Sequence, residues 1–269
     1  MDEGRTPAVV FDHVSLSFDE TVILRDVSFT LWPGRTTIIL GASGAGKSMS
    51  LKILLGLIKP DGGAVYVFGR RVDQLPEAEM MRVRAEIGMV FQEGALFDSL
   101  TVRENVGYRL YEETDMPIEE VDRRVEEVLG FVGLREYLDR MPSELSSGER
   151  RRVAIARAMA SKPKILLYDE ATTGLDPITA LTVDDEIIKL RDLEHVTSIV
   201  VTHQLRDAFY VATRTAVRGS DGTIRIEAAE RDKERETEFL MLHEGRIVFE
   251  GDAAALRRSG DEYIRSFLS

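Results

Sequence analysis

Cysteine is absent from the 269 residues, which excludes disulfide bridges, cysteine-ligated zinc sites and cysteine nucleophiles. Long hydrophobic runs are absent too, because no stretch reaches the roughly 18 consecutive apolar residues that a membrane-spanning helix needs. The amino terminus opens with acids, Met1-Asp2-Glu3-Gly4-Arg5, and lacks the basic and apolar regions of a secretory signal. These absences predict a cytoplasmic protein that does not cross a bilayer by itself.

Positive charge is in the minority. Lys and Arg number 35 against 47 Asp and Glu, which gives a formal net charge of -12. This sign disfavours broad contact with a phosphate backbone, so we expect no nucleic-acid partner. The rest of the composition, 43% hydrophobic and 30% charged, is that of an ordinary folded protein long enough for one or two domains.

Short apolar runs alternate with helical segments along the sequence. The runs are residues 38–40, 87–91, 165–168 and 199–201, and a helical pattern with Leu181, Ile187 and Leu190 separates the last two. Buried strands that alternate with helices predict a parallel sheet covered on both faces. Hairpin patterns precede residue 34 and recur near 65–69, whereas residues 93–160 have helical periodicity, typical of a helical insertion.

We therefore predict a single α/β domain over residues 1–269. Its nucleotide-binding core comprises 1–91 and 161–252, its helical subdomain 92–160, and its C-terminal tail 253–269. Residues 225–238 carry ten charged positions of both signs, which predicts a solvated loop or a hairpin tip, with a protein contact as the alternative. The tail has the apolar spacing of an amphipathic helix that docks on its own domain or on a partner; its apolar residues are Leu256, Tyr263, Ile264, Phe267 and Leu268.

A phosphate-binding loop is the most specific motif. The segment fits G-x-x-x-x-G-K-S, follows an apolar strand and opens a helix, which is the context that identifies the motif; its residues are Gly41, Ala42, Ser43, Gly44, Ala45, Gly46, Lys47 and Ser48, and Met49 follows. The glycines allow the backbone to form a concave set of N–H donors, and Lys47 reaches the β and γ phosphates. Ser48 supplies a hydroxyl for Mg²⁺.

Two acids end the apolar run at 165–168. Asp169 is placed to hold a water on Mg²⁺ opposite Ser48. Glu170 follows it, and an ionised carboxylate there can polarise the water that attacks the γ phosphate. Acids after a strand also cap helices, but the phosphate loop makes the catalytic interpretation the better one.

Further motifs occur in the order found in ATP-binding cassette (ABC) ATPases, which the chain resembles over roughly residues 10–210. Leu145-Ser146-Ser147-Gly148-Glu149 looks like the family signature, Gln92 is similar to the glutamine loop, Gly174-Leu175-Asp176 resembles the aspartate loop, His203 looks like the switch histidine, and Phe18 matches the position that stacks on adenine. The combination is far more specific than any one motif.

The resemblance implies a P-loop NTPase (RecA-like) core with an antiparallel β subdomain and an inserted α-helical subdomain. It also implies hydrolysis of ATP with Mg²⁺ in a head-to-tail homodimer, each ATP lying between Lys47 of one copy and the signature of the other. In that arrangement the nucleotide contacts Ser146, Ser147, Gly148, Glu149 and Asp176, Mg²⁺ is held by Ser48, Gln92 and Asp169, and catalysis involves Glu170, His203, Gln92 and Lys47. The departures are Ser147 in place of a signature glycine, Ala171 in place of proline, and Met49 in place of a hydroxyl residue.

Each of these residues also has an ordinary structural interpretation. Phe18 fits a plain core position, His203 a hydrogen-bonded histidine at a strand end, and Gln92 a surface glutamine. The arginines at 150, 151, 152 and 157 fit mostly a solvated helix face, with a specific phosphate or partner contact as the alternative. Residues 95–97 and Leu100 fit either a surface that receives a helix from a membrane partner or the core of the helical subdomain.

The segment Phe91-Gln92-Glu93-Gly94-Ala95-Leu96-Phe97, with the residues up to 110, resembles the ATPase subunit of Mla/Mce-type phospholipid transporters, in which F-Q-x-G-A-L-F recurs. Residues 141–146 and 176–179 are also similar to that branch. The resemblance implies an integral membrane permease, an MCE-domain lipid-binding protein and a small accessory subunit as partners, with the ATPase on the inner face of the cell membrane. The alternatives are the ATPase of a small-solute importer, a soluble ABC switch protein, and a nucleotide-binding scaffold that does not turn over.

Overall fold

The computed structural model describes residues 5–269, so the acidic start at residues 1–4 lies outside the described residues. The strands are β1 (Val9–Phe18), β2 (Thr21–Leu31), β3 (Thr36–Leu40), β4 (Gly62–Val67), β5 (Arg70–Arg71), β6 (Ile87–Val90), β7 (Ile165–Asp169), β8 (Thr197–Thr202), β9 (Arg214–Arg218), β10 (Ile224–Ala228), β11 (Thr237–His243) and β12 (Arg246–Gly251). The α-helices are α1 (Lys47–Leu54), α2 (Glu77–Ala85), α3 (Val102–Glu113), α4 (Ile118–Phe131), α5 (Ser147–Ala160), α6 (Pro177–Leu193), α7 (Leu205–Thr213), α8 (Arg231–Glu234), α9 (Ala253–Arg257) and α10 (Glu262–Leu268).

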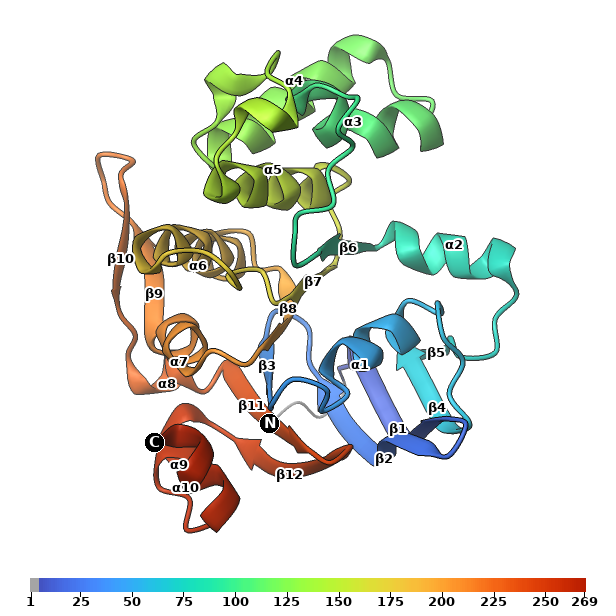
Figure 1. The fold of residues 1–269 in the computed structure, drawn as a ribbon. Helices are drawn as coiled ribbons and strands as arrows, with labels where there is room; N and C mark the ends of the chain where they lie inside the picture. Colours follow the sequence, from blue (N-terminus) through green and yellow to red (C-terminus); the bar gives the residue numbers. More distant parts are fainter. Residues whose placement is uncertain (1–4) are drawn as a thin grey trace.

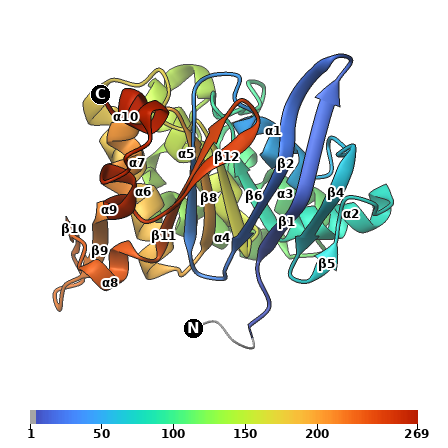
Figure 2. The same ribbon diagram turned by 90° about the horizontal axis from the view of Figure 1, so that it is seen from below.

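The central sheet has the order β12-β11-β3-β8-β7-β6, with β12 antiparallel to β11 and the other pairs parallel. Its strands are apolar on both sides because alternate residues enter two different cores. In β3, Ile38 and Leu40 belong to a core shared with helices α3 to α7. Ile39 belongs to a second core, shared with α1 and strands β1, β2 and β4. The predicted parallel sheet is confirmed, but one face is covered largely by a second sheet (Figure 2).

That second sheet has the order β2-β1-β4-β5 and is antiparallel throughout. The hairpin that joins β1 to β2 lies over the start of α1, because a Cβ added to Gly46 would meet Leu24 at 2.6 Å. Helices α6 and α7 cover the other face of the central sheet, and α3, α4 and α5 form a separate helical layer next to α6 and β6, at the top of Figure 1. The expected strand at 87–91 ends at Val90, and Phe91 is exposed beyond it.

The charged segment at 225–238 differs from the expected solvated loop. Residues 224–228 form β10, which pairs with β9 as the second strand of a hairpin, and 231–234 form the short helix α8. The tip of the hairpin lies before this segment, where Gly219 N–H donates to Thr223 O. The segment is therefore one side of a hairpin followed by a helix.

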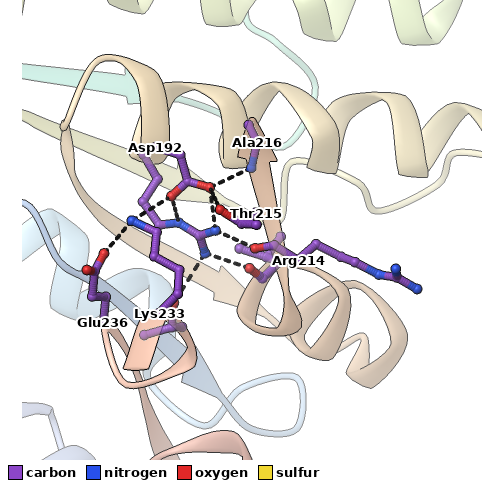
Figure 3. A network of polar contacts seen from close by, with 9 residues as sticks. Asp192, Arg214, Thr215, Ala216, Lys233 and Glu236 are labelled. Carbon is purple, nitrogen blue, oxygen red and sulfur yellow. Dashed lines mark hydrogen bonds and ion pairs between the residues drawn. The ribbon is translucent and has the colours of Figure 1, made fainter. Parts of the chain in front are cut away.

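A buried ion-pair network fixes this hairpin and α8 to the end of α6 (Figure 3). The Arg191 guanidinium donates to Asp192 and to the carbonyls of Val211 and Arg214. Asp192 also accepts from the Ala216 N–H at 2.8 Å, and Lys233 lies 3.1 Å from it. Burial acts to raise the pKa of Asp192, yet the bonds from Arg191, Ala216 and Lys233 together hold that pKa below its usual value. The carboxylate is thus the common anchor of three elements.

The C-terminal tail docks on its own domain, which decides between the two expectations for it. Leu256 and Ile264 are buried, and Tyr263, Phe267 and Leu268 pack partly buried against the helical-layer core. Within residues 5–269, no helix combines the length and the apolar composition required to span a membrane.

Candidate nucleotide-binding site

The loop between β3 and α1 has the backbone that its glycines permit. Gly44 and Gly46 have φ values of 81° and 100°, in the left-handed region that favours glycine. A Cβ on Gly46 would also lie 2.9 Å from the Ile23 carbonyl oxygen. No side chain caps the amino end of α1, so its first N–H groups are available to an anion. Ala42 and Ser43 are exposed, whereas Ala45 and Met49 pack partly into the core under the second sheet.

Lys47 points back into this loop. Its ammonium donates to Gly41 O at 2.9 Å and to Ala42 O at 3.0 Å, and only 4% of the residue is exposed. Burial lowers the pKa of Lys47, and the nearby carboxylate of Glu170 partly opposes that shift. The cation therefore lies where a phosphate can replace the two carbonyls as its partner.

Ser48 and Asp169 are joined by a direct hydrogen bond. Ser48 Oγ donates to Asp169 Oδ1 at 2.7 Å, which brings the start of α1 to the end of β7. Burial raises the pKa of Asp169, and the charge of Glu170 adds to the shift. The hydrogen bond from Ser48 and the charges of Lys52 and Lys47 oppose it but do not cancel it. A hydroxyl and a carboxylate oxygen suit Mg²⁺, which takes one or two protein ligands beside phosphates and waters. Among residues 5–269 no cluster of three His, Cys, Asp or Glu side chains is suited to a metal, and this two-oxygen site requires none.

Glu170 occupies the centre of the site. It has a left-handed backbone with φ 50°, and its N–H donates to Val201 O at 2.9 Å. Its Oε1 lies 3.2 Å from His203 Nδ1 and 3.6 Å from Lys47 Nζ. Thr173 Oγ1 donates to Oε2 at 3.2 Å. The structure thus brings Glu170, His203 and Lys47 together, with the carboxylate near both an imidazole and an ammonium.

Gln92 and Phe18 lie at the margin of this group. Gln92 follows β6, whose Val90 pairs with Tyr168 of β7, so it leaves the same sheet edge as Glu170. It is exposed, and within residues 5–269 it makes no hydrogen bond to Ser48 or Asp169. Phe18 is 45% exposed at the end of β1, so the expectation that it is a core residue is wrong.

The signature forms the amino end of α5. Ser146 is the N-cap: its Oγ accepts from the Glu149 N–H, and Glu149 Oε2 accepts from the Ser146 N–H at 2.7 Å. The Glu149 carboxylate is therefore engaged in helix capping. These bonds, that from the Ser146 N–H above all, lower the pKa of Glu149. Ser147 is exposed, whereas a Cβ on Gly148 would lie 2.2 Å from Thr179 Cγ2.

The aspartate loop leads into α6. Asp176 is the N-cap of that helix and accepts from the N–H groups of Ile178 and Thr179, both at 3.1 Å. The Thr179 hydroxyl has the largest part in lowering the pKa of Asp176. Because Thr179 also packs on Gly148, the signature and the aspartate loop touch within one chain. Both lie on other elements than α1, in the upper part of the molecule (Figure 1).

The arginines of α5 were expected on a solvated face, and this is wrong. Each donates to a backbone carbonyl at the end of another segment: Arg150 to Leu145, Arg151 to Thr173, Arg152 to Val132, and Arg157 to both Gly94 and Ala95. Two of these bonds reach the site directly, because Thr173 follows Glu170 and Gly94 follows Gln92. Sequence charge alone gave no signal for them, since a guanidinium that binds a carbonyl has the same local pattern as a solvated one.

Comparison with known proteins agrees with this geometry. A sequence profile of the ABC transporter family matches residues 24–173. Over 270 residues the chain is 38% identical to the chloroplastic protein TRIGALACTOSYLDIACYLGLYCEROL 3 of Arabidopsis thaliana, a match that covers 94% of this chain and 71% of that protein. It is 43% identical over 223 residues to the methionine import ATP-binding protein MetN of Cereibacter sphaeroides, covering 80% of this chain. The chain spans 63% of the length of that MetN protein.

The fold also matches a solved ATP-binding cassette, MJ0796, in a dimeric post-hydrolysis state bound to ADP and Pi. The TM-score is 0.73 at 29% sequence identity, and the match covers 91% of this chain and 98% of the cassette. An ABC ATPase fold with an antiparallel β sheet and a helical subdomain is thereby confirmed. The chain belongs to the ABC transporter family, as an ATP-hydrolysing cassette that uses ATP and Mg²⁺.

Proposed function

We propose that this cassette is the motor of a membrane transporter that moves phospholipid or a related lipid, of the Mla/Mce type. Two features support the lipid assignment. The alignment with the Arabidopsis relative, whose name contains that of a galactolipid, covers 94% of the chain at 38% identity. The segment from Phe91 to Leu110 also resembles the Mla/Mce ATPases in sequence.

The observation that carries the catalytic part is the position of Glu170 between His203 and Lys47. In this proposal Glu170 is the general base, holding the attacking water and accepting its proton. His203 orients the Glu170 carboxylate and contacts the γ phosphate, while Lys47 leaves the loop carbonyls to bind phosphate oxygens. Mg²⁺, when bound by Ser48, Asp169 and Gln92, supplies charge neutralisation at the phosphates.

The second half of each nucleotide site comes from a second copy of the chain. The signature and Asp176 lie on other elements than the phosphate loop, and MJ0796 is dimeric. We infer a head-to-tail homodimer in which Ser146, Ser147 and Gly148 face the phosphates bound to the partner, with Glu149 fixing the helix end. In this proposal Phe18, exposed at the end of β1, stacks on adenine.

A groove between the core and the helical layer is the proposed contact for the permease. It has a volume of about 500 Å³, and its apolar lining includes Leu57, Met81, Phe91, Phe97 and Tyr108. Each of these five residues is at least 41% exposed, and the ring centroids of Phe97 and Tyr108 lie 4.6 Å apart. Such a groove suits an apolar helix of a membrane protein. Leu96, by contrast, packs on the core of the helical layer.

The groove lies beside the glutamine loop, so a helix seated there would move with Gln92. The cassette would then act as one unit, with the core at 1–91 and 161–252, the helical subdomain at 92–160 and the tail at 253–269. The full complex would contain the homodimer, an integral membrane permease, an MCE-domain lipid-binding protein and a small accessory subunit. It would place the cassette on the cytoplasmic face of the membrane.

The test is to isolate the cassette with its co-purifying chains, identify them by mass spectrometry, and reconstitute the complex in lipid vesicles. ATP-dependent movement of labelled phospholipid between vesicles and a carrier is expected, and the Glu170→Gln complex should show none. Transfer that does not depend on ATP would contradict the proposal, as would a complex that lacks a permease.

A small-solute importer is the second candidate, because identity with the methionine import protein reaches 43%. The same reconstituted complex discriminates the two. Lipid transport predicts that phospholipid is moved and that methionine neither stimulates hydrolysis nor enters the vesicles. Methionine uptake without lipid movement would show that the cassette belongs to a small-solute importer. The proposed ATPase chemistry would be unchanged.

A further inference from the structure

The last helix of the chain is fixed beside the end of β11. Ile264 is buried, and Asp261 caps the helix by accepting from the Ile264 N–H at 3.0 Å. The ring of Tyr263 stacks on the ring of His243, with centroids 3.6 Å apart and an interplanar angle of 24°. His243 is the last residue of β11. The buried Ile264 and an aromatic pair at the end of β11 therefore set the position of α10.

The end of β11 also borders the phosphate loop. Strands β3 and β11 pair in parallel with Leu40 opposite Met241, so the loop and the residues after Met241 leave the sheet side by side. The approach is close, because a Cβ added to Gly41 would lie 2.5 Å from the Leu242 carbonyl oxygen. His243 therefore lies beside the start of the loop, and Tyr263, stacked on it, lies there too.

The hydroxyl of Tyr263 is the polar atom at this junction. It is buried, and no group among residues 5–269 reaches it with normal hydrogen-bond geometry. The backbone N–H of Ala42 faces it and favours the ionised form, although burial has the larger effect and raises the pKa of Tyr263. A neutral hydroxyl in this position can accept from that N–H after a small adjustment of the loop.

Ala42 is thus bonded at its carbonyl and has the Tyr263 hydroxyl next to its N–H. Its carbonyl accepts from Lys47 Nζ at 3.0 Å, and its N–H faces Tyr263. When Lys47 turns to a phosphate, the carbonyl of Ala42 loses its partner, but the contact on the N–H side is not affected. We propose that Tyr263 is a positioning residue for nucleotide binding, which holds the first residues of the phosphate loop through its hydroxyl and couples the C-terminal helix to nucleotide affinity. The proposal rests on the assignment of residues 41–48 as the nucleotide site.

The test uses the full chain and the fluorescent analogue mant-ADP. Tyr263→Phe keeps the ring stack and removes only the oxygen, so it should raise the Kd for mant-ADP and the KM for ATP by about three- to tenfold. Because the loss applies equally to ground state and transition state, kcat should stay within about twofold. Arg265→Ala is the matched control, since Arg265 is exposed on the same helix, and it should leave both constants unchanged.

A second pair of variants tests whether the ring of His243 positions Tyr263. His243→Ala removes the ring under Tyr263 and should raise the Kd as Tyr263→Phe does, whereas His243→Phe keeps a ring and should not. An unchanged Kd in Tyr263→Phe, or equal losses in Tyr263→Phe and Arg265→Ala, would overturn the proposal. Failure of the nucleotide-site assignment would look different: Lys47→Ala would bind mant-ADP as well as the unmodified chain does.

Discussion

One residue in a left-handed backbone conformation determines the reactive end of the site. Glu170 has φ 50°, and its N–H is bonded to Val201 of the neighbouring strand. Such a conformation costs a non-glycine residue of order 1 kcal/mol or more, so the surrounding structure must impose it. The turn directs the carboxylate away from the sheet edge and towards Lys47 and His203. A strained backbone at this point is consistent with a general base held in advance of the reaction.

Replacing Glu170 by Gln should separate binding from chemistry. The amide keeps the size of the side chain but cannot accept the proton of an attacking water, so we expect ATP hydrolysis to fall by about 100-fold or more. ATP affinity should change little, because the phosphate loop is untouched. Phosphate release and equilibrium binding of ATP measure the two effects. Turnover near the unmodified rate would show that Glu170 is not the general base.

Gly148 is the signature residue that the fold requires to be glycine. An alanine Cβ there would overlap Thr179 Cγ2, so Gly148→Ala should displace the start of α5 from α6 and lower kcat by about tenfold or more. Gly130→Ala is the matched control, because Gly130 is exposed in α4 and a Cβ added there would meet nothing within 4 Å. Steady-state hydrolysis of both variants is the measurement.

A double variant tests the cause of that loss. Thr179→Ser removes Cγ2 and keeps the hydroxyl that bonds Asp176; the remaining Thr179 Cβ would be 3.6 Å from the new methyl, an ordinary contact. Gly148→Ala combined with Thr179→Ser should therefore recover much of the lost activity. If the double variant is no better than Gly148→Ala alone, the defect does not come from the contact between α5 and α6.

At the level of elements, α5 connects the parts of the site. Its capping box forms the signature, Arg157 holds the loop after Gln92, and Arg151 holds the loop after Glu170. The helix itself and its N-cap follow from local sequence, since Ser146 and Glu149 have capping-box spacing. The arginine contacts do not, because their partners are carbonyls 22 to 63 residues away. Local charge patterns carry no information on contacts of this range.

The packing of α6 against α7 buries an acidic pair. Asp184 and Asp207 are 1% and 3% exposed, and one oxygen of each has no hydrogen-bond partner among the described residues. Burial raises the pKa of Asp184 to about 8, with the charge of Asp207 adding to the shift; Arg206 opposes it and Asp185 adds a little. At neutral pH Asp184 is therefore protonated in the folded protein and ionised in the unfolded chain.

This difference predicts a pH-dependent stability. The folded state holds a proton that the unfolded state releases above about pH 4, so the contribution of Asp184 declines as pH rises and is lost by about pH 8. Asp184→Asn, which mimics the neutral acid, should gain stability over the unmodified chain by about 1.4 kcal/mol per pH unit between pH 5 and 8. Denaturant unfolding at both pH values measures it. Asp232→Asn, at a side chain 97% exposed, should show no such trend, and a gain that is the same at pH 5 and 8 would contradict the assignment.

For the whole molecule, sequence predicts the alternating elements and the motif order better than their arrangement in space. The strands β3, β6, β7 and β8 are buried at nearly every position, and the continuous apolar runs that this burial requires are visible in the residues themselves. The covering of one sheet face by β1, β2 and β4 is not visible in the sequence, because it depends on which strand residues enter which core. The fixing of the charged hairpin by Asp192 is equally non-local, because its partners lie on α6, β9 and α8.

The face that carries the signature and the aspartate loop is the proposed contact between two copies. Single exposed apolar residues are common on protein surfaces, but Ile178 is 79% exposed directly after the aspartate loop, which is expected to meet the partner. It follows Asp176 by two positions, in the first turn of α6. We infer that this side chain becomes buried when ATP closes the dimer.

An acid at Ile178 should therefore prevent closure without affecting the monomer. In a Glu170→Gln background, where ATP is bound and not consumed, Ile178→Asp should weaken ATP-dependent dimerisation by about tenfold or more, because a carboxylate would have to lose its hydration in the contact. ATP affinity of the monomer should be unchanged, since the phosphate loop lies on another element. Leu57→Asp is the control, because Leu57 is 57% exposed in the groove proposed for the permease. Analytical ultracentrifugation with and without ATP distinguishes the variants, and a dimer that forms equally well with Asp at 178 would exclude this face from the contact.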